Sequence, residues 1–115
     1  MTLLLLITLG GGIGAVLRYI VTVVASKYSK ASYVATLIVN VSGSFLMGIG
    51  IKSLMMEPTM TAFLLTGILG GFTTFSTFAF DMVHLLYQRK IRECIFYTMS
   101  TLTLGFIFVA IGYWL

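Results

Sequence analysis

The sequence predicts an all-α membrane protein, with a single domain over residues 1–115, on three observations. Hydrophobic residues make up 59% of the chain and charged residues only 9%, whereas a soluble domain carries about 25% charged residues. Apart from Arg18, four apolar stretches are each uncharged over about 20 residues, which is the length that crosses a bilayer. A run of glycines, hydroxyls and aromatic rings interrupts the third stretch. We therefore expect four transmembrane helices, the third broken near its middle, over residues 3–26, 32–54, 59–86 and 94–115.

The first expected span contains a cation within its apolar stretch. Arg18 lies eight residues before Ser26, and a guanidinium inside a bilayer costs about 2.5–3.5 kcal/mol on insertion scales unless it reaches the surface. Arg18 is either an interfacial anchor or a cation that draws anions into a vestibule, and the two roles are compatible. Small residues that let helices approach closely recur through the first three spans, which indicates helix association and at least a dimer. They are Gly10, Gly11, Gly12, Gly14, Gly43, Gly48, Gly50, Gly67, Gly70 and Gly71.

The second expected span contains a polar stripe. Thr36, Asn40 and Ser44 are spaced four residues apart, so they lie on one face of the helix. One interpretation is hydrogen bonding between helices, which is common for these residue types in membrane bundles. For Asn40 the other interpretation is contact with a passing anion, because its amide nitrogen donates two hydrogen bonds.

The third expected span contains the most informative segment of the chain, Gly70-Gly71-Phe72-Thr73-Thr74-Phe75-Ser76-Thr77-Phe78. Irregular backbone at membrane depth is tolerated only where it is buried in protein or lines a water-filled path. Four hydroxyls directly after a double glycine predict a helix interruption, and carbonyls at such a break can coordinate a cation. Phe75 and Phe78 share a helix face, and their positive ring edges could favour a small anion.

The fourth expected span adds a short polar line, with Tyr97 and Thr101 four residues apart and Gly105 one turn further on. No carboxylate is expected deep in any span, because the acidic residues and the histidine are placed near span ends. The chain shows no catalytic triad, metal-ligand cluster or phosphate loop, so we do not expect an enzyme. The residues placed near span ends are Glu57, Asp81, His84 and Glu93.

The basic residues predict the orientation of the chain in the plasma membrane. Five lie in the first and third connections, and Lys52 is alone at the other side. Because basic loops stay in the cytoplasm, residues 27–31 and 87–93 are expected there, with both termini outside. The net charge of +4 reflects this anchoring rather than a nucleic-acid site. The five residues are Lys27, Lys30, Arg89, Lys90 and Arg92.

Three segments carry a resemblance to a known family. They are GGIGAVLRY at residues 11–19, TLIVNVSGSF at residues 36–45 and GGFTTFSTF at residues 70–78. On these segments the chain resembles the Fluc/CrcB fluoride channels along nearly its whole length. The resemblance implies an antiparallel dimer of four-helix subunits with two pores, which passively exports fluoride and so relieves its toxicity.

The resemblance also implies roles for single residues. Arg18 would lie in an aqueous vestibule, and backbone carbonyls at Gly70 and Thr73 would bind a structural sodium ion at the dimer interface. The chain departs from the family pattern at Ala35, where the family usually has glycine, and at Gly105, where the fourth-helix line of hydroxyls would continue. The implied fluoride pore consists of Asn40, Phe75, Phe78, Ser76, Thr77, Tyr97 and Thr101.

The loop charges bear on the identity of the second subunit. A homodimer of opposed subunits needs each chain to insert in both directions, and five basic residues against one are not balanced. We therefore expect a heterodimer with an oppositely oriented homologue, and a dual-topology homodimer is the less favoured arrangement. Two other functions stay open from the residues alone: a four-span, dual-topology, proton-coupled multidrug antiporter, or a membrane partner subunit that does not conduct.

Overall fold

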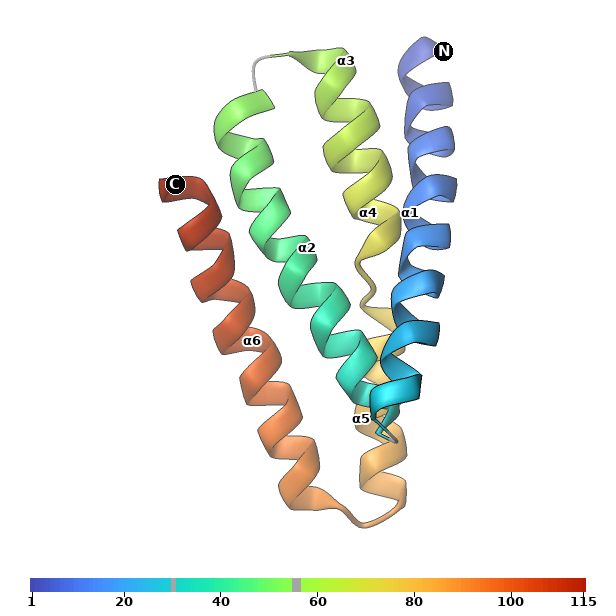
Figure 1. Ribbon diagram of the computed structural model, residues 1–115, viewed down its shortest axis with the longest axis vertical. Coiled ribbons are helices and arrows are strands. Elements are labelled where there is room, and N and C mark those ends of the chain that lie inside the picture. Colours follow the sequence, from blue (N-terminus) through green and yellow to red (C-terminus); the bar gives the residue numbers. More distant parts are fainter. Residues whose placement is uncertain (30, 55–56) are drawn as a thin grey trace.

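The computed structural model describes residues 1–29, 31–54 and 57–115. Helix α1 spans Thr2–Tyr28, α2 spans Ser32–Leu54 and α6 spans Ile91–Trp114. Between α2 and α6 the third span runs back across the bundle in several pieces, and both termini lie at the same end of the molecule (Figure 1). Lys30, which the charge argument counts, lies outside the described residues, as do Met55 and Met56 in the second connection.

The predicted all-α membrane fold is confirmed. Four of the described helical segments are long and apolar enough to cross a membrane, and the described ranges contain no strand. The longest dimension of the molecule is 46 Å, close to the roughly 40–45 Å of a bilayer with its headgroups. Helix α2 has the predicted bounds, the first and third spans extend one or two residues beyond theirs, and the fourth begins three residues earlier and ends one residue earlier than predicted.

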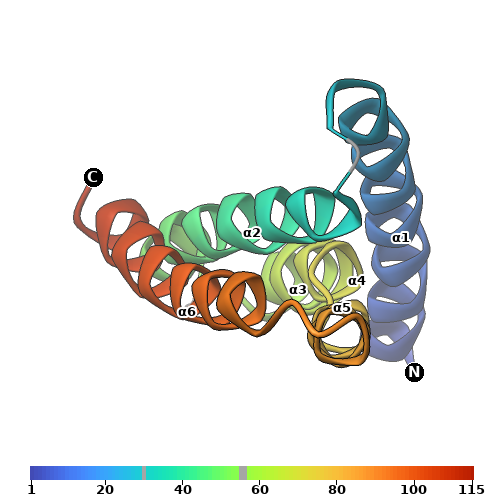
Figure 2. The same ribbon diagram turned by 90° about the horizontal axis from the view of Figure 1, so that it is seen from below.

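The helices pack in two close pairs. Helix α2 packs mainly against α6, and α1 packs mainly against the third span. Figure 2 shows α1 and α6 at opposite sides of the bundle, with α2 and the third span between them. A side chain at Gly14 of α1 would overlap the Ile68 backbone, and one at Gly48 of α2 would overlap the Val109 backbone. These glycines therefore allow the close backbone packing on which membrane helix pairs depend.

The third span contains four helical segments and one break. It begins with α3 (Pro58–Met60), where the Glu57 carboxylate accepts hydrogen bonds from the Thr59 and Met60 amides at 3.1 Å. A π-helix, η1 (Thr61–Leu69), leads directly into α4 (Gly70–Phe72). The chain becomes extended at Thr73, with φ −79° and ψ 158°, and α5 (Ser76–Tyr87) follows.

The break lies two to three residues beyond its predicted position. We expected it at Gly70–Thr73, but Gly70 and Gly71 are helical, and only Thr73 of that segment lies in the interruption. Gly71 has a packing function instead, because a side chain there would overlap the Gly11 carbonyl of α1. The chain leaves the helix at β-branched threonines, which favour extended backbone.

Candidate ion pathway

Asn40 of α2 holds the broken backbone of the third span. Its Nδ2 donates to the Thr74 carbonyl at 2.9 Å, and its Oδ1 accepts from the Thr74 amide at 2.8 Å. A helix break leaves peptide groups without intrahelical partners, and in a membrane each must find a partner within the protein. One asparagine therefore supplies a partner for both backbone groups of Thr74, a residue that is only 8% exposed.

The hydroxyls after the break bond mainly to one another. The Thr77 amide donates to the Thr74 hydroxyl at 3.1 Å, in the first turn of α5. The same hydroxyl donates to Thr77 Oγ1 at 3.2 Å and lies 3.3 Å from Ser76 Oγ. At the other side of the break, Thr73 Oγ1 donates to the Leu69 carbonyl at 2.9 Å. This polar segment is thus internally bonded, which fixes the positions of Phe75 and the start of α5.

A cavity of about 440 Å³ brings together four of the seven predicted pore residues: Asn40, Phe75, Phe78 and Thr101. The two phenylalanine ring centroids lie 6.1 Å apart with their planes at 49°. Phe75 is 71% exposed, so one side of this cavity is open in the single chain. The remaining wall residues are Gly43, Ser44, Met47, Thr73, Thr74, Leu102 and Val109.

Tyr97, Ser76 and Thr77 lie outside that cavity. Tyr97 is only 1% exposed, and its ring packs against Phe78 at 5.3 Å and against Tyr33 at 5.0 Å. Thr101 Oγ1 donates to the Tyr97 carbonyl at 2.8 Å, which joins the two predicted α6 residues. Ser76 and Thr77 are exposed at the start of α5. The structure therefore places Tyr97 behind the cavity wall.

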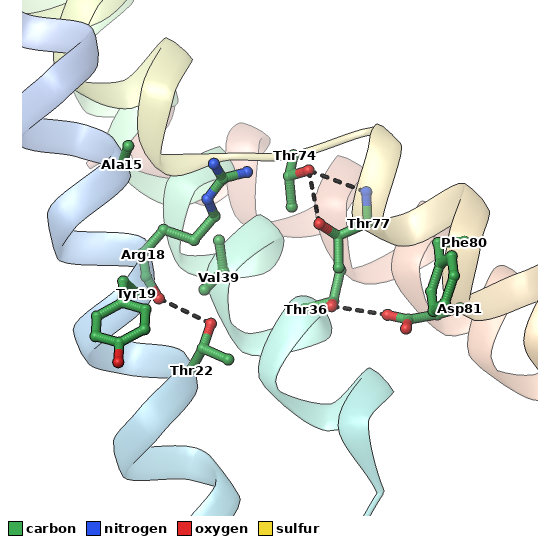
Figure 3. Close-up of a pocket in the computed structure, with 10 residues that line it drawn as sticks. All are labelled: Ala15, Arg18, Tyr19, Thr22, Thr36, Val39, Thr74, Thr77, Phe80 and Asp81. Carbon is green, nitrogen blue, oxygen red and sulfur yellow. Dashed lines mark hydrogen bonds between the residues drawn. The ribbon is translucent and has the colours of Figure 1, made fainter.

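A second cavity, of about 420 Å³, contains the predicted vestibule residue Arg18. Figure 3 shows its side chain extending from α1 toward the segment at Thr74. Thr77 and Asp81 of α5 line the same cavity, as does Thr36 of α2. Because Thr74 lines both cavities, the break in the third span is a wall that they share.

Asp81 is the residue whose burial the sequence interpretation missed. It was expected near a span end, with no carboxylate deep in any span. The structure buries it to 5% exposure, six residues before the end of α5 at Tyr87. Its carboxylate accepts hydrogen bonds from Thr36 Oγ1 at 2.8 Å and from the Tyr97 hydroxyl at 3.2 Å. The interhelical hydrogen bonding considered for the α2 stripe is thus present at Thr36, which bonds to α5, and at Asn40, which bonds to the break in the third span.

Ser44 completes the α2 stripe and lies opposite the Gly105 departure. Its hydroxyl donates to the Asn40 carbonyl of its own helix at 2.8 Å. The same oxygen lies 3.6 Å from the position that a Cβ at Gly105 would occupy. A hydroxyl from α2 is therefore present where α6 lacks one. Ala35, the other departure, is buried in the core.

Comparison with known proteins decides the family. A family profile described as "CrcB-like protein, Camphor Resistance (CrcB)" matches residues 5–113. The chain belongs to the CrcB family. It is 35% identical to the protein named fluoride-specific ion channel FluC of Hydrogenobaculum sp. (strain Y04AAS1), over 94% of this chain and 92% of that one.

Two numbered relatives show the same full-length similarity. The chain is 39% identical to fluoride-specific ion channel FluC 2 of Staphylococcus epidermidis (strain ATCC 12228 / FDA PCI 1200), over 98% of both chains. It is 37% identical to fluoride-specific ion channel FluC 1 of Ligilactobacillus salivarius (strain UCC118), over 95% of both. These names indicate an ion channel rather than an enzyme, and they confirm the resemblance read from the sequence.

Family membership also bears on the antiporter alternative. A proton-coupled antiporter needs an ionisable residue within the membrane, and Asp81 of the third span is an acidic residue buried among its helices. The residues alone therefore still leave a proton-coupled antiporter open. The family assignment favours a channel instead.

Proposed function

We propose that this protein is a fluoride-selective anion channel of the plasma membrane, which lets fluoride leave the cell passively and so relieves its toxicity. The cavity at the break in the third span carries the proposal, because Asn40 holds there a backbone segment that presents Phe75 to the same space as Phe78. Relatives named as fluoride-specific channels match over nearly the full chain.

The cavity offers fluoride a small number of donors between apolar walls. Asn40 Nδ2 carries two N–H groups, of which one bonds to Thr74, and we assign the other to the anion. The edges of the Phe75 and Phe78 rings carry positive charge and so attract an anion. Thr101 adds a hydroxyl whose hydrogen can rotate toward a ligand. In the second cavity Arg18 draws anions from solution toward Thr77.

Substitution of the phenylalanines tests this function. Phe75→Ile and Phe78→Ile keep an apolar side chain but remove the ring edges, so fluoride efflux from liposomes should fall at least tenfold. Phe106→Ile is the matched control, because Phe106 is an exposed ring on α6 outside the cavity walls. Unchanged efflux in both cavity variants, with correct folding, would contradict the proposed pathway.

We also propose that the active form is an antiparallel dimer with an oppositely oriented homologue, with a dual-topology homodimer as the less favoured form. The polar residues Thr66, Ser76 and Thr77 support this, because they are exposed on the single chain, and lipid would offer their hydroxyls no hydrogen bonds whereas a partner subunit could. The charge bias favours a second chain, and so do relatives named FluC 1 and FluC 2. Cysteines introduced at the termini and in residues 87–93, labelled from each side of intact cells, test the proposed orientation with both termini outside.

A structural sodium ion at the dimer interface is a further part of the proposal. Thr73 lies in the break and Gly70 is exposed on the same span, so their carbonyls are candidate ligands together with the partner's copies. Carbonyls of unwound backbone, such as that of Thr73, coordinate sodium in other membrane proteins. Replacing sodium by N-methylglucamine should lower the thermal stability of the purified dimer, and identical melting in both salts would contradict the site.

We propose that the Ser44 hydroxyl of α2 takes the place in the pore of the hydroxyl that α6 lacks at Gly105. The short distance from Ser44 Oγ to the Gly105 position supports the assignment. Ser44→Ala should therefore reduce fluoride efflux, and Ser44→Ala with Gly105→Ser should recover part of it. If Ser44→Ala lost efflux and the double variant recovered none of it, the proposal that Ser44 replaces a hydroxyl at position 105 would be contradicted.

A further inference from the structure

The turn between α5 and α6 concentrates positive charge at one end of the molecule. Arg89, Lys90 and Arg92 lie within four residues and are exposed. Lys90 lines a small polar pocket together with Glu93, which also accepts a hydrogen bond from the Tyr33 hydroxyl at 3.5 Å. Of the three cations in this turn, Arg89 and Arg92 therefore lie outside the pocket.

Arg89 adopts a backbone conformation that its side chain disfavours. Its φ is 61°, and the described residues contain no other non-glycine residue with positive φ. The Lys90 amide donates to the Leu85 carbonyl at 2.9 Å and the Arg89 amide to the Leu86 carbonyl at 3.0 Å. This pattern ends many helices, and the residue in the left-handed conformation is usually glycine. An arginine is strained in this backbone conformation, where glycine would not be. Because such strain is often kept at binding sites, it indicates a binding function for the Arg89 guanidinium.

An exposed apolar strip on α6 begins next to Arg92. Ile95, Phe96 and Met99 follow Arg92 at spacings of three, four and seven residues, so they share its side of the helix. All three are more than half exposed. Figure 1 shows the α5–α6 turn at the end of the bundle, which is the depth of lipid headgroups for a helix that crosses the bilayer.

We propose that this surface binds one anionic phospholipid, with its phosphate on Arg89 and Arg92 and an acyl chain along Ile95, Phe96 and Met99. Arginine matches phosphate geometry through paired N–H groups, and the strip lies where the chain of such a lipid would run. A single basic residue at a helix end would interact with whichever anionic headgroups are nearby and would not require a specific lipid. Arg89 in the left-handed turn and Arg92 in the first turn of α6, next to an apolar strip, instead form a site for a single lipid.

Lipid titration of the purified full-length protein tests this proposal. In an uncharged detergent, the thermal shift is measured against added dioleoyl phosphatidylglycerol, dioleoyl phosphatidylcholine or inorganic phosphate. The phosphatidylglycerol should bind at least tenfold more tightly than the other two. Arg89→Gly and Arg92→Gln should each weaken its binding about fivefold, the usual contribution of one basic residue at an anionic surface.

Two features of this experiment separate a lipid site from general attraction. Arg89→Gly suits the left-handed turn, so its melting temperature without lipid should not fall, and a loss of lipid binding cannot be ascribed to misfolding. Lys27→Gln is the matched control, because Lys27 is an exposed cation in the last turn of α1, away from the α5–α6 turn (Figure 2). Equal binding of both lipids, an equal effect of inorganic phosphate, or equal losses in Arg89→Gly and Lys27→Gln would each overturn the proposal.

Discussion

Asn40→Asp tests the connection between the helix break and ion flow. The substitution preserves side-chain size and the oxygen that accepts from the Thr74 amide at 2.8 Å. It replaces the Nδ2 donor, 2.9 Å from the Thr74 carbonyl, by a second oxygen. That carbonyl loses its partner and faces a carboxylate oxygen, while a negative charge enters the cavity proposed for fluoride.

The expected cost follows from these contacts. A buried carbonyl left without a donor costs about 1–3 kcal/mol, and the Thr74 residue is 8% exposed. We therefore expect Asn40→Asp to lower the free energy of unfolding by that amount. Loss of the donor assigned to fluoride and repulsion by the new charge should together reduce fluoride efflux at least a hundredfold, since each tenfold step needs only about 1.4 kcal/mol.

Two measurements on the same preparation separate the effects: thermal unfolding in detergent, and fluoride efflux from liposomes. Ser42→Ala is the control, because the Ser42 hydroxyl donates to the Ile38 carbonyl of its own helix at 2.7 Å and lies outside the cavity walls. It should leave both measurements near those of the unmodified protein. Asn40→Asp with unchanged efflux and unchanged unfolding would refute the proposed function of this residue.

Further predictions concern the packing and the buried carboxylate. Gly71→Ala should lower the free energy of unfolding by about 1–3 kcal/mol, because the new methyl group overlaps the Gly11 carbonyl; Gly70→Ala, which has room for a methyl group, should be close to neutral, and equal melting of the two variants would contradict this. Asp81→Ala should reduce fluoride efflux at least tenfold, because it removes the acceptor that positions the Tyr97 hydroxyl. Asp81→Asn keeps an acceptor oxygen and should retain more efflux than Asp81→Ala; the same efflux in both variants would argue against this positioning function.

The overall fold was predictable because the bilayer imposes a simple length rule on apolar sequence. Four uncharged stretches could only be membrane helices, and the described helices begin and end close to the predicted limits. The exact position of the break was not predictable. Glycine is compatible with both a break and a close helix crossing, and only the approach of Gly71 to Gly11 decides for the crossing.

The site was partly predictable for a similar reason. Asn40, Phe75, Phe78 and Thr101 carry recognisable chemistry, and the structure brings them to one cavity. The pairing of Asn40 with the Thr74 backbone depends on a contact between two helices, which spacing along one helix cannot reveal. Asp81 left a signal that was overlooked, because it lies within the predicted third span at three and four residues from Phe78 and Thr77.

Anion selectivity of efflux is the most direct measurement. Liposomes loaded with fluoride or with chloride would contain this chain alone or the chain coexpressed with an oppositely oriented homologue from the same cell. We expect fluoride efflux without chloride efflux in the coexpressed preparation, and little of either with the single chain. Strong fluoride efflux from the single chain would remove the need for a second subunit while leaving the channel intact. Chloride efflux equal to that of fluoride, or no fluoride efflux in either preparation, would contradict a fluoride-selective pathway through the cavity of Asn40, Phe75 and Phe78.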